Sequence, residues 1–154
     1  MSDLRSPVRP DYADRLSQPV EDALVLAGRL ALGVIFVKSG LQKLLTLSAF
    51  AASLGARGIP QSGIWAAVGA IVEFVGGVLI VTGFKTRCAS LLMILFVLVA
   101  TGISHRFWEF ADAARRAQES EFFKNLAIIG GFVLLFVTGP GRYSVDTLLR
   151  SRKP

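Results

Sequence analysis

Four long apolar stretches, separated by polar segments, dominate the pattern along the chain. They lie at residues 23–45, 64–84, 88–105 and 122–139. About 20 apolar residues, rising 1.5 Å each along a helix, span the ~30 Å hydrocarbon core of a bilayer. The pattern therefore predicts an all-α fold with four transmembrane helices.

The polar connections indicate how these helices follow one another. Residues 85–87 form a link that is long enough only for a tight turn, so the second and third helices must be antiparallel neighbours. Residues 46–63 have apolar spacing early and then glycines and Pro60, which predicts a loop or a short interfacial helix. Residues 106–124 are charged and aromatic, which fits an interfacial segment and a polar loop equally well. We expect an integral membrane four-helix bundle with antiparallel transmembrane helices.

The bundle should occupy residues 20–146, between two polar ends. Residues 1–19 carry three prolines and mixed charges and predict a flexible tail. They contain no apolar signal segment, so we expect insertion to depend on the first span. Residues 147–154 form a basic tail, and Ser144 is placed to cap a short helix before it.

Composition strengthens the membrane assignment. Of the 154 residues 53% are hydrophobic, far more than a soluble domain of this size contains. The net charge of +6 comes from Lys and Arg that flank the spans, so we expect no nucleic-acid partner. Cys88, the one cysteine, excludes an intramolecular disulfide and is interpreted as a packing residue at a helix start. With a single histidine, His105, we expect no metal site.

The distribution of Lys and Arg outside the spans predicts the orientation. The side that holds both ends of the chain carries Arg5, Arg9, Arg15, Lys85, Arg87, Arg142, Arg150, Arg152 and Lys153. The other side carries only Arg57, Arg106, Arg115 and Arg116. Because the more basic side faces the cytoplasm, both termini should be cytoplasmic.

Glu73 lies near the middle of the second span. A charge at that depth costs at least ~2.5–3.5 kcal/mol on insertion scales, so Glu73 should face inward and be paired. Lys43, His105 and Asn125 all lie near the outer ends of their spans. At 1.5 Å per residue Lys43 is about 12 Å from Glu73 in depth, a gap that a water could bridge. Arg29 is deeper and should extend to the cytoplasmic headgroups.

Glycines within the spans predict where helices approach one another closely, because small residues let helix backbones meet in membranes. The predicted packing positions are Gly33, Gly40, Gly69, Gly76, Gly77, Gly130 and Gly131.

Two interpretations of the polar residues remain open at this point. In one, Glu73 is the floor of an outward-facing pocket with Lys43, His105 and Asn125 at its rim. Such a pocket could bind a quinone headgroup, a small anion or protons. In the other, a structural ion pair fixes the register between helices.

Three segments together resemble the DoxX family of small bacterial inner-membrane proteins. They are GRLALGVIFVKSGLQKL in the first span, GAIVEFVGGVLIVTGFKTR across the second, and the closing GPGRYSVD, so that the resemblance covers Gly28 to Asp146. The positions that match the family pattern are Arg29, Gly40, Lys43, Glu73, Gly76, Gly77, Gly83, Gly139, Pro140, Gly141, Arg142 and Asp146.

The resemblance implies a four-helix protein of the bacterial inner membrane. Family members carry an oxidoreductase label, linked to a subunit of a thiosulfate:quinone oxidoreductase and to thiol-stress systems. The residues give this label little support, since a second cysteine, a cluster of metal ligands and a dinucleotide fingerprint are all missing. Whether the protein is an enzyme is therefore left open, and quinone is the one cofactor that the resemblance suggests.

Three function classes follow. The first is a membrane accessory subunit or scaffold, associated with a quinone- or sulfur-linked redox system and with other membrane subunits or further copies of itself as partners. The second is an oxidoreductase subunit that binds quinone around Glu73. The third is a small oligomeric transporter, although four helices are few for one. We favour the first class.

Overall fold

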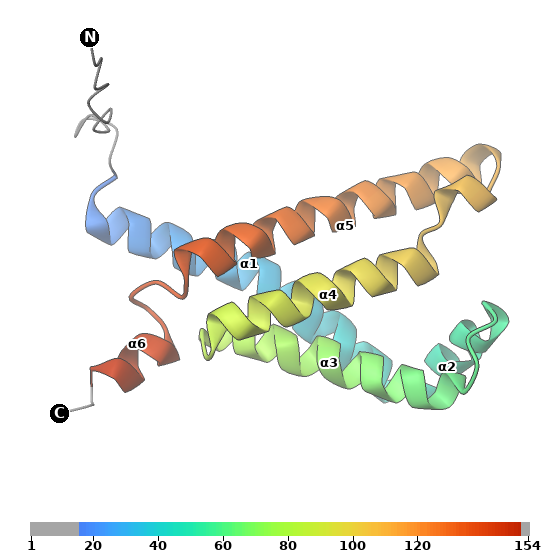
Figure 1. The fold of residues 1–154 in the computed structure, drawn as a ribbon, viewed down its shortest axis with the longest axis horizontal. Helices are drawn as coiled ribbons and strands as arrows, with labels where there is room; N and C mark the ends of the chain where they lie inside the picture. The colour runs from blue at the N-terminus through green and yellow to red at the C-terminus, as the bar shows by residue number, and fades with distance from the viewer. Residues whose placement is uncertain (1–15, 152–154) are drawn as a thin grey trace, which may run out of the picture.

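The computed structural model describes residues 16–151, and within this range the chain is helical with no β-strand (Figure 1). The all-α prediction is therefore confirmed. The elements are α1 (Gln18–Leu45), α2 (Leu47–Ala56), α3 (Ser62–Thr82), α4 (Thr86–Ser104), the 3₁₀ turn η2 (Phe107–Glu109), α5 (Asp112–Thr138) and α6 (Val145–Arg150). Most of the expected N-terminal tail, residues 1–15, and residues 152–154 lie outside the described part.

Among the described residues, three segments are long and apolar enough to cross a membrane: α3, α4 continued through η2, and α5. The helix α1 has 28 residues but contains Arg29, Lys38 and Lys43. Its role as a fourth span stays a prediction.

The helices form two pairs. The first helix α1 packs along α3, and α4 packs along α5, while the tight turn after Gly83 joins α3 to α4. Gly83 has a φ of 69°, a left-handed conformation that glycine adopts readily and that ends α3. Toward the end that carries α2 and η2, the two pairs diverge (Figure 1). This divergence positions the site described below.

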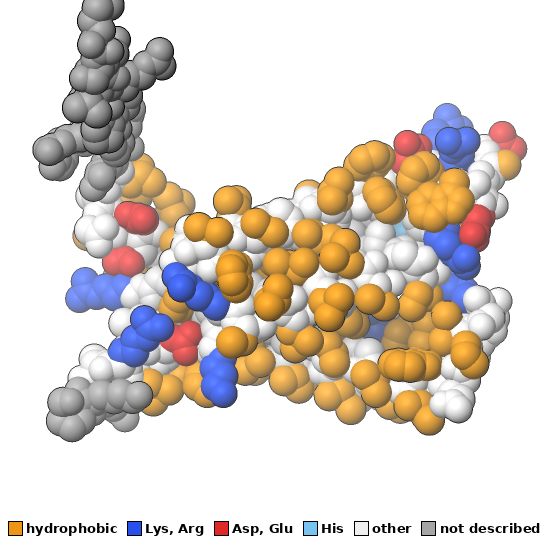
Figure 2. Space-filling model, in the orientation of Figure 1, with side chains coloured by type: hydrophobic (Ala, Val, Ile, Leu, Met, Phe, Trp, Pro, Cys, Tyr) orange, Lys and Arg blue, Asp and Glu red, His pale blue; other side chains and the backbone are white. Residues whose placement is uncertain are grey.

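A small apolar core joins the two pairs. Phe36 of α1, Ile80 of α3, Met93 of α4 and Phe132 of α5 are buried together, and the ring centroids of Phe36 and Phe132 are 5.5 Å apart. Many other large apolar side chains are exposed, and Figure 2 shows them between two ends that carry the charged residues. So extensive an apolar surface suits lipid rather than water.

Glycines hold α1 against α3. A Cβ atom on Gly40 would lie 2.5 Å from the backbone N of Phe74, and one on Gly77 would lie 2.7 Å from the backbone N of Val37. The two backbones therefore touch, as small residues allow in membranes. Among the other glycines expected to pack, Gly33, Gly69, Gly76 and Gly131 each face another element within 4 Å. Gly130 has no such neighbour among the described residues, so it does not take part in the helix packing seen within residues 16–151.

The structure decides between the two alternatives for one connection and corrects two other expectations. Residues 46–63 contain a helix, α2, which is one of the two alternatives. The last long helix begins at Asp112 rather than near residue 122, so only residues 105–111 form the connection between α4 and α5. Cys88 does lie at the start of α4, but it is exposed and does not pack within the chain.

Candidate functional site

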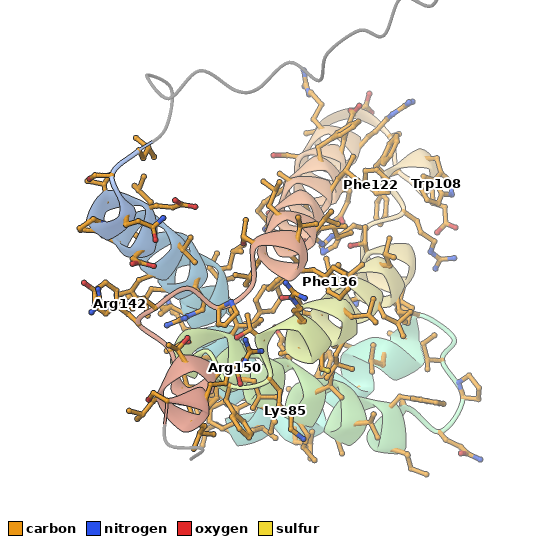
Figure 3. All side chains as sticks on the ribbon, turned by 60° about the vertical axis from the view of Figure 1, so that its left-hand side comes forward. Lys85, Trp108, Phe122, Phe136, Arg142 and Arg150 are labelled. Atoms are coloured by element: carbon orange, nitrogen blue, oxygen red, sulfur yellow. The ribbon has the colours of Figure 1, made fainter. Side chains whose placement is uncertain are left out.

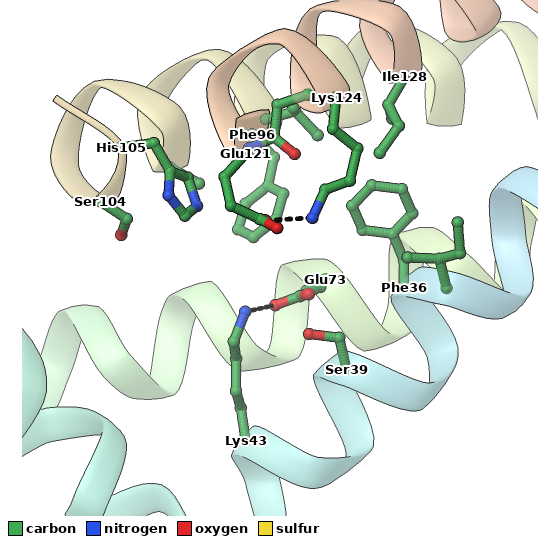
Figure 4. A pocket seen from close by; sticks show the side chains of 14 residues that line it. Phe36, Ser39, Lys43, Glu73, Phe96, Ser104, His105, Glu121, Lys124 and Ile128 are labelled. Atoms are coloured by element: carbon green, nitrogen blue, oxygen red, sulfur yellow. Dashed lines mark hydrogen bonds and ion pairs between the residues drawn. The ribbon is translucent and has the colours of Figure 1, made fainter. Parts of the chain in front are cut away.

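A cavity of about 210 Å³ lies where the two helix pairs diverge (Figure 4). Glu73 of α3 and Lys43 of α1 line one side, and Asn125 of α5 and His105, directly after α4, line the other. All four residues singled out from the sequence thus border one space. They come from segments that are far apart along the chain.

Glu73 and Lys43 form a direct ion pair. The distance between Lys43 Nζ and Glu73 Oε2 is 2.5 Å, and the side chain of Lys43 is 32% exposed whereas that of Glu73 is 4% exposed. The expected 12 Å difference in depth between Lys43 and Glu73 is wrong. It was counted on the assumption that the outer ends of α1 and α3 lie at the same depth in the membrane. Instead, Gly40 lies beside Phe74, so α3 extends beyond the end of α1 and packs there against α2.

His105 and Asn125 are held by neighbours on their own side of the cavity. His105 Nδ1 lies 2.9 Å from Oε1 of Gln118, and Asn125 Nδ2 donates to Thr101 Oγ1 at 2.9 Å. Among the described contacts, neither side chain bonds to Lys43 or Glu73. Both are therefore fixed at the wall, with hydrogen-bonding capacity left for a molecule in the cavity.

The sequence analysis missed four polar residues of the cavity: Ser39, Ser104, Glu121 and Lys124. Glu121 and Lys124 form an ion pair of their own, and Figure 4 shows this pair facing Lys43 and Glu73 across the space. A signal was present in the helical spacing, because positions 121, 125 and 128 fall on one face of a helix. It was overlooked because residues up to 124 were assigned to a connection.

Apolar side chains complete the cavity. Phe36, Phe96, Val97 and Ile128 line the part that adjoins the core. The cavity therefore combines an apolar wall with ammonium, carboxylate, amide and imidazole groups. This arrangement suits a small molecule with one apolar side and one side that accepts hydrogen bonds.

Arg29 lies away from this cavity and does not extend to the headgroups, so that expectation is wrong. Its side chain is buried at 2% exposure and donates to the carbonyl oxygens of Pro140 and Tyr143, the latter at 2.5 Å. The end of α3 closes over it, since a Cβ on Gly83 would lie 2.5 Å from Arg29 Nη1. The guanidinium thus ties α1 to the segment that follows α5.

Asp146 completes the same end of the molecule. Its carboxylate accepts the backbone N–H groups of Lys85 at 2.8 Å and Thr86 at 3.0 Å, at the start of α4. Partial burial acts to raise the pKa of Asp146, but these hydrogen bonds and the charge of Arg150 outweigh it and hold the pKa below its usual value.

We call Arg29, Gly83, Pro140, Tyr143 and Asp146 the closing cluster. Ser144, between Tyr143 and Asp146 in the sequence, accepts the backbone N–H of Thr147 and caps α6, as expected. Gly139 and Gly141 have φ values of 81° and 70°, and the backbone N–H of Arg142 donates to Asp22 on α1. The closing motif GPGRYSVD therefore connects the segment after α5 to α1, α3 and α4 through hydrogen bonds and close packing. This is a structural role.

Comparisons with known proteins agree with the motifs. The sequence model of the DoxX family matches residues 24–106. The chain is 35% identical to the inner membrane protein YqjF of Escherichia coli over 86% of this chain and 97% of that protein. It is 32% identical to the inner membrane protein YphA of Escherichia coli over 80% and 88% of the two chains, and 28% identical to the membrane protein Rv3486 of Mycobacterium tuberculosis over 83% and 82%. No solved structure matches. The chain therefore belongs to the DoxX family of membrane proteins.

Proposed function

We propose that this DoxX-family membrane protein is an accessory subunit that holds a small polar ligand in the cavity around Glu73. The observation that carries this proposal is that the buried Glu73–Lys43 pair opens onto a cavity of about 210 Å³. An ion pair that served only to fix the register between two helices would be most stable when packed side chains enclose it. Burying charges is costly, and each of their remaining polar atoms then needs a partner within the protein.

The two members of the pair differ in a way that suits ligand binding. Glu73 is almost fully buried, whereas about a third of the Lys43 side chain is exposed toward the opening. Lys43 can therefore turn its remaining N–H donors toward a ligand while it stays paired with Glu73. The proposed role of Glu73 is to hold the ammonium in place, and that of Lys43 is to bind an oxygen atom of the ligand.

A quinone headgroup is the more specific candidate for this ligand. The cavity places the aromatic residues Phe36 and Phe96 beside the donors Lys43 and Asn125, which matches a flat ring with carbonyl oxygens at its edge. A bound quinone would supply two-electron redox chemistry. The residues of this chain would bind and orient it, and a partner subunit would provide the rest of the reaction.

The relatives support the membrane setting of this proposal. The two from Escherichia coli are inner membrane proteins, and we propose the same membrane for this chain, with α1 as a fourth span. We further propose that both termini face the cytoplasm, from the excess of Lys and Arg at that end. The cavity then opens toward the opposite side of the membrane.

The test is to purify the protein in mild detergent and to identify co-purified chains and organic-extractable molecules by mass spectrometry. We expect a partner chain and a small ligand with the wild type, and loss of the ligand in Lys43→Met. Lys38→Met is the matched control, because Lys38 lies on the same helix but is exposed outside the cavity. Equal ligand retention in both variants, or no ligand in any sample, would contradict the proposal.

A further inference from the structure

A second cavity, an apolar groove of about 400 Å³, lies between α1 and α5. It is bordered by residues 25–32 of α1 and 131–138 of α5, almost all of them small or apolar. The two helices touch in few places, so their facing sides remain uncovered. Gly28, on the α1 side, has no neighbour from residues 16–151 within 4 Å of the position that a Cβ atom would take.

Among residues 16–151, Arg29 is the one charged residue that borders this groove. It is only 2% exposed, and within the described part of the chain its Nε has no hydrogen-bond partner. The other guanidinium nitrogens donate to the carbonyls of Pro140 and Tyr143, which carry no net charge. The negative charge of Asp146 interacts with Arg29 at a distance. The Asp146 carboxylate accepts hydrogen bonds from backbone N–H groups instead, and in the described residues it forms no ion pair with Arg29. A buried guanidinium in this state still lacks an anion.

The groove is directed toward the basic end of the molecule. At that end Arg87 lies beside the last turn of α5, where its Nη2 donates to the carbonyl of Val137 at 3.5 Å. Arg142 is exposed in the segment after α5, close to α1 (Figure 3). Figure 2 shows Lys and Arg side chains at this end of the molecule together with Asp and Glu side chains. Asp22 accepts the backbone N–H of Arg142, so the guanidinium groups of Arg87 and Arg142 are the groups at this end that an anion would meet.

We propose that the groove binds one acyl chain of an anionic phospholipid, with the phosphate at the end of the groove near Arg29 and Arg142. The shape favours a lipid over a helix from another chain. Leu32 closes the groove at its inner end, because its side chain lies 3.1 Å from where a Cβ on Gly131 would be. An acyl chain can end there, whereas a packed helix needs an open path and about 8–10 Å between axes.

The test uses native mass spectrometry of the full chain in mild detergent, mixed with equal amounts of phosphatidylglycerol and phosphatidylcholine that carry the same acyl chains. We expect the wild type to retain the anionic lipid about fivefold more, the factor that one basic residue near an anionic surface supplies. Arg142→Gln should reduce this preference without disturbing the closing cluster, because the described hydrogen bonds of Arg142 involve only its backbone N–H and carbonyl groups.

Gly28→Leu should abolish lipid retention, because its side chain enters the groove where space is free. The matched control is Gly102→Leu on α4, which also has open space around it but lies outside the groove. Ala31→Leu fills the groove from a second position and replaces Gly28→Leu if that variant does not fold. Equal lipid retention in the groove-filling variants and in the Gly102→Leu control would overturn the proposal, and so would equal retention of the two lipids by the wild type. A wild-type dimer that the groove-filling variants disrupt would also overturn it, because the groove would then bind a second copy of the chain.

Discussion

Replacing Gly40 with alanine tests the packing on which the Glu73 site depends. The added Cβ would lie 2.5 Å from the backbone N and 2.7 Å from the Cα of Phe74. These are backbone atoms, which cannot rotate away as a side-chain end can. Since carbon atoms pack at roughly 3.5–4.0 Å, α1 and α3 must separate locally by about 1 Å.

The magnitude follows from two opposing effects. Forcing an extra carbon into a packed seam typically costs ~1–3 kcal/mol. Replacing glycine by alanine inside a helix gains back roughly 0.5–1 kcal/mol. At the midpoints of these ranges the Gly40→Ala variant should be less stable by about 1 kcal/mol, which corresponds to a Tm lower by roughly 2–4 °C for a chain of this size.

The control is Gly130→Ala, on a helix of the same protein. Its Cβ would have no neighbour within 4 Å, so only the helix-propensity gain applies. We expect a Tm equal to or about 2 °C above that of the wild type. Both variants should be melted in the same detergent. A Gly40→Ala protein as stable as the Gly130→Ala protein would refute the contact between α1 and α3 and, with it, the position of Lys43 beside Glu73.

Three further predictions follow from the ion pair, the closing cluster and the orientation. Glu73→Gln should lower stability, because it leaves the Lys43 ammonium without its partner. The loss should be smaller than the ~3–5 kcal/mol of a fully buried pair, since about a third of the Lys43 side chain is exposed. The double variant with Lys43→Met should recover much of this loss in thermal melts, and a double variant less stable than Glu73→Gln would contradict the pairing. Because the pKa of Asp146 is lowered on folding, its contribution to stability is complete above its unfolded pKa of about 3.9 and is lost as the pH falls through the folded value. Asp146→Asn should accordingly have a lower Tm than the wild type at pH 7 and an equal one at the acid limit, and a constant difference would argue against this role. Reporter fusions after Arg87 and at the C-terminus should read cytoplasmic and one after Gln118 should not, whereas a periplasmic C-terminus would reverse the proposed orientation.

The sequence by itself determined the class of the protein. Long apolar runs have few stable solutions other than membrane helices, so the all-α fold and the membrane setting could be read from the pattern. The family was also accessible, because its motifs are local strings such as GPGRYSVD. Glu73 was recognisable as special for a similar reason, since a carboxylate in an apolar run is costly wherever its partners lie.

The tertiary structure decided how the helices are set against one another, and the errors on the depth of Lys43 and on the partners of Arg29 share this cause. Spacing along one helix gives the face of a residue but says nothing of its depth relative to another helix. The contact of Gly40 with Phe74 sets that depth for α1 and α3 and brings Lys43 to Glu73 directly. Arg29 likewise donates hydrogen bonds to the carbonyl oxygens of Pro140 and Tyr143, which lie more than a hundred residues further along the chain. No local sequence pattern could indicate these acceptors. Helix register is a property of packed surfaces, and it arises only when distant segments meet.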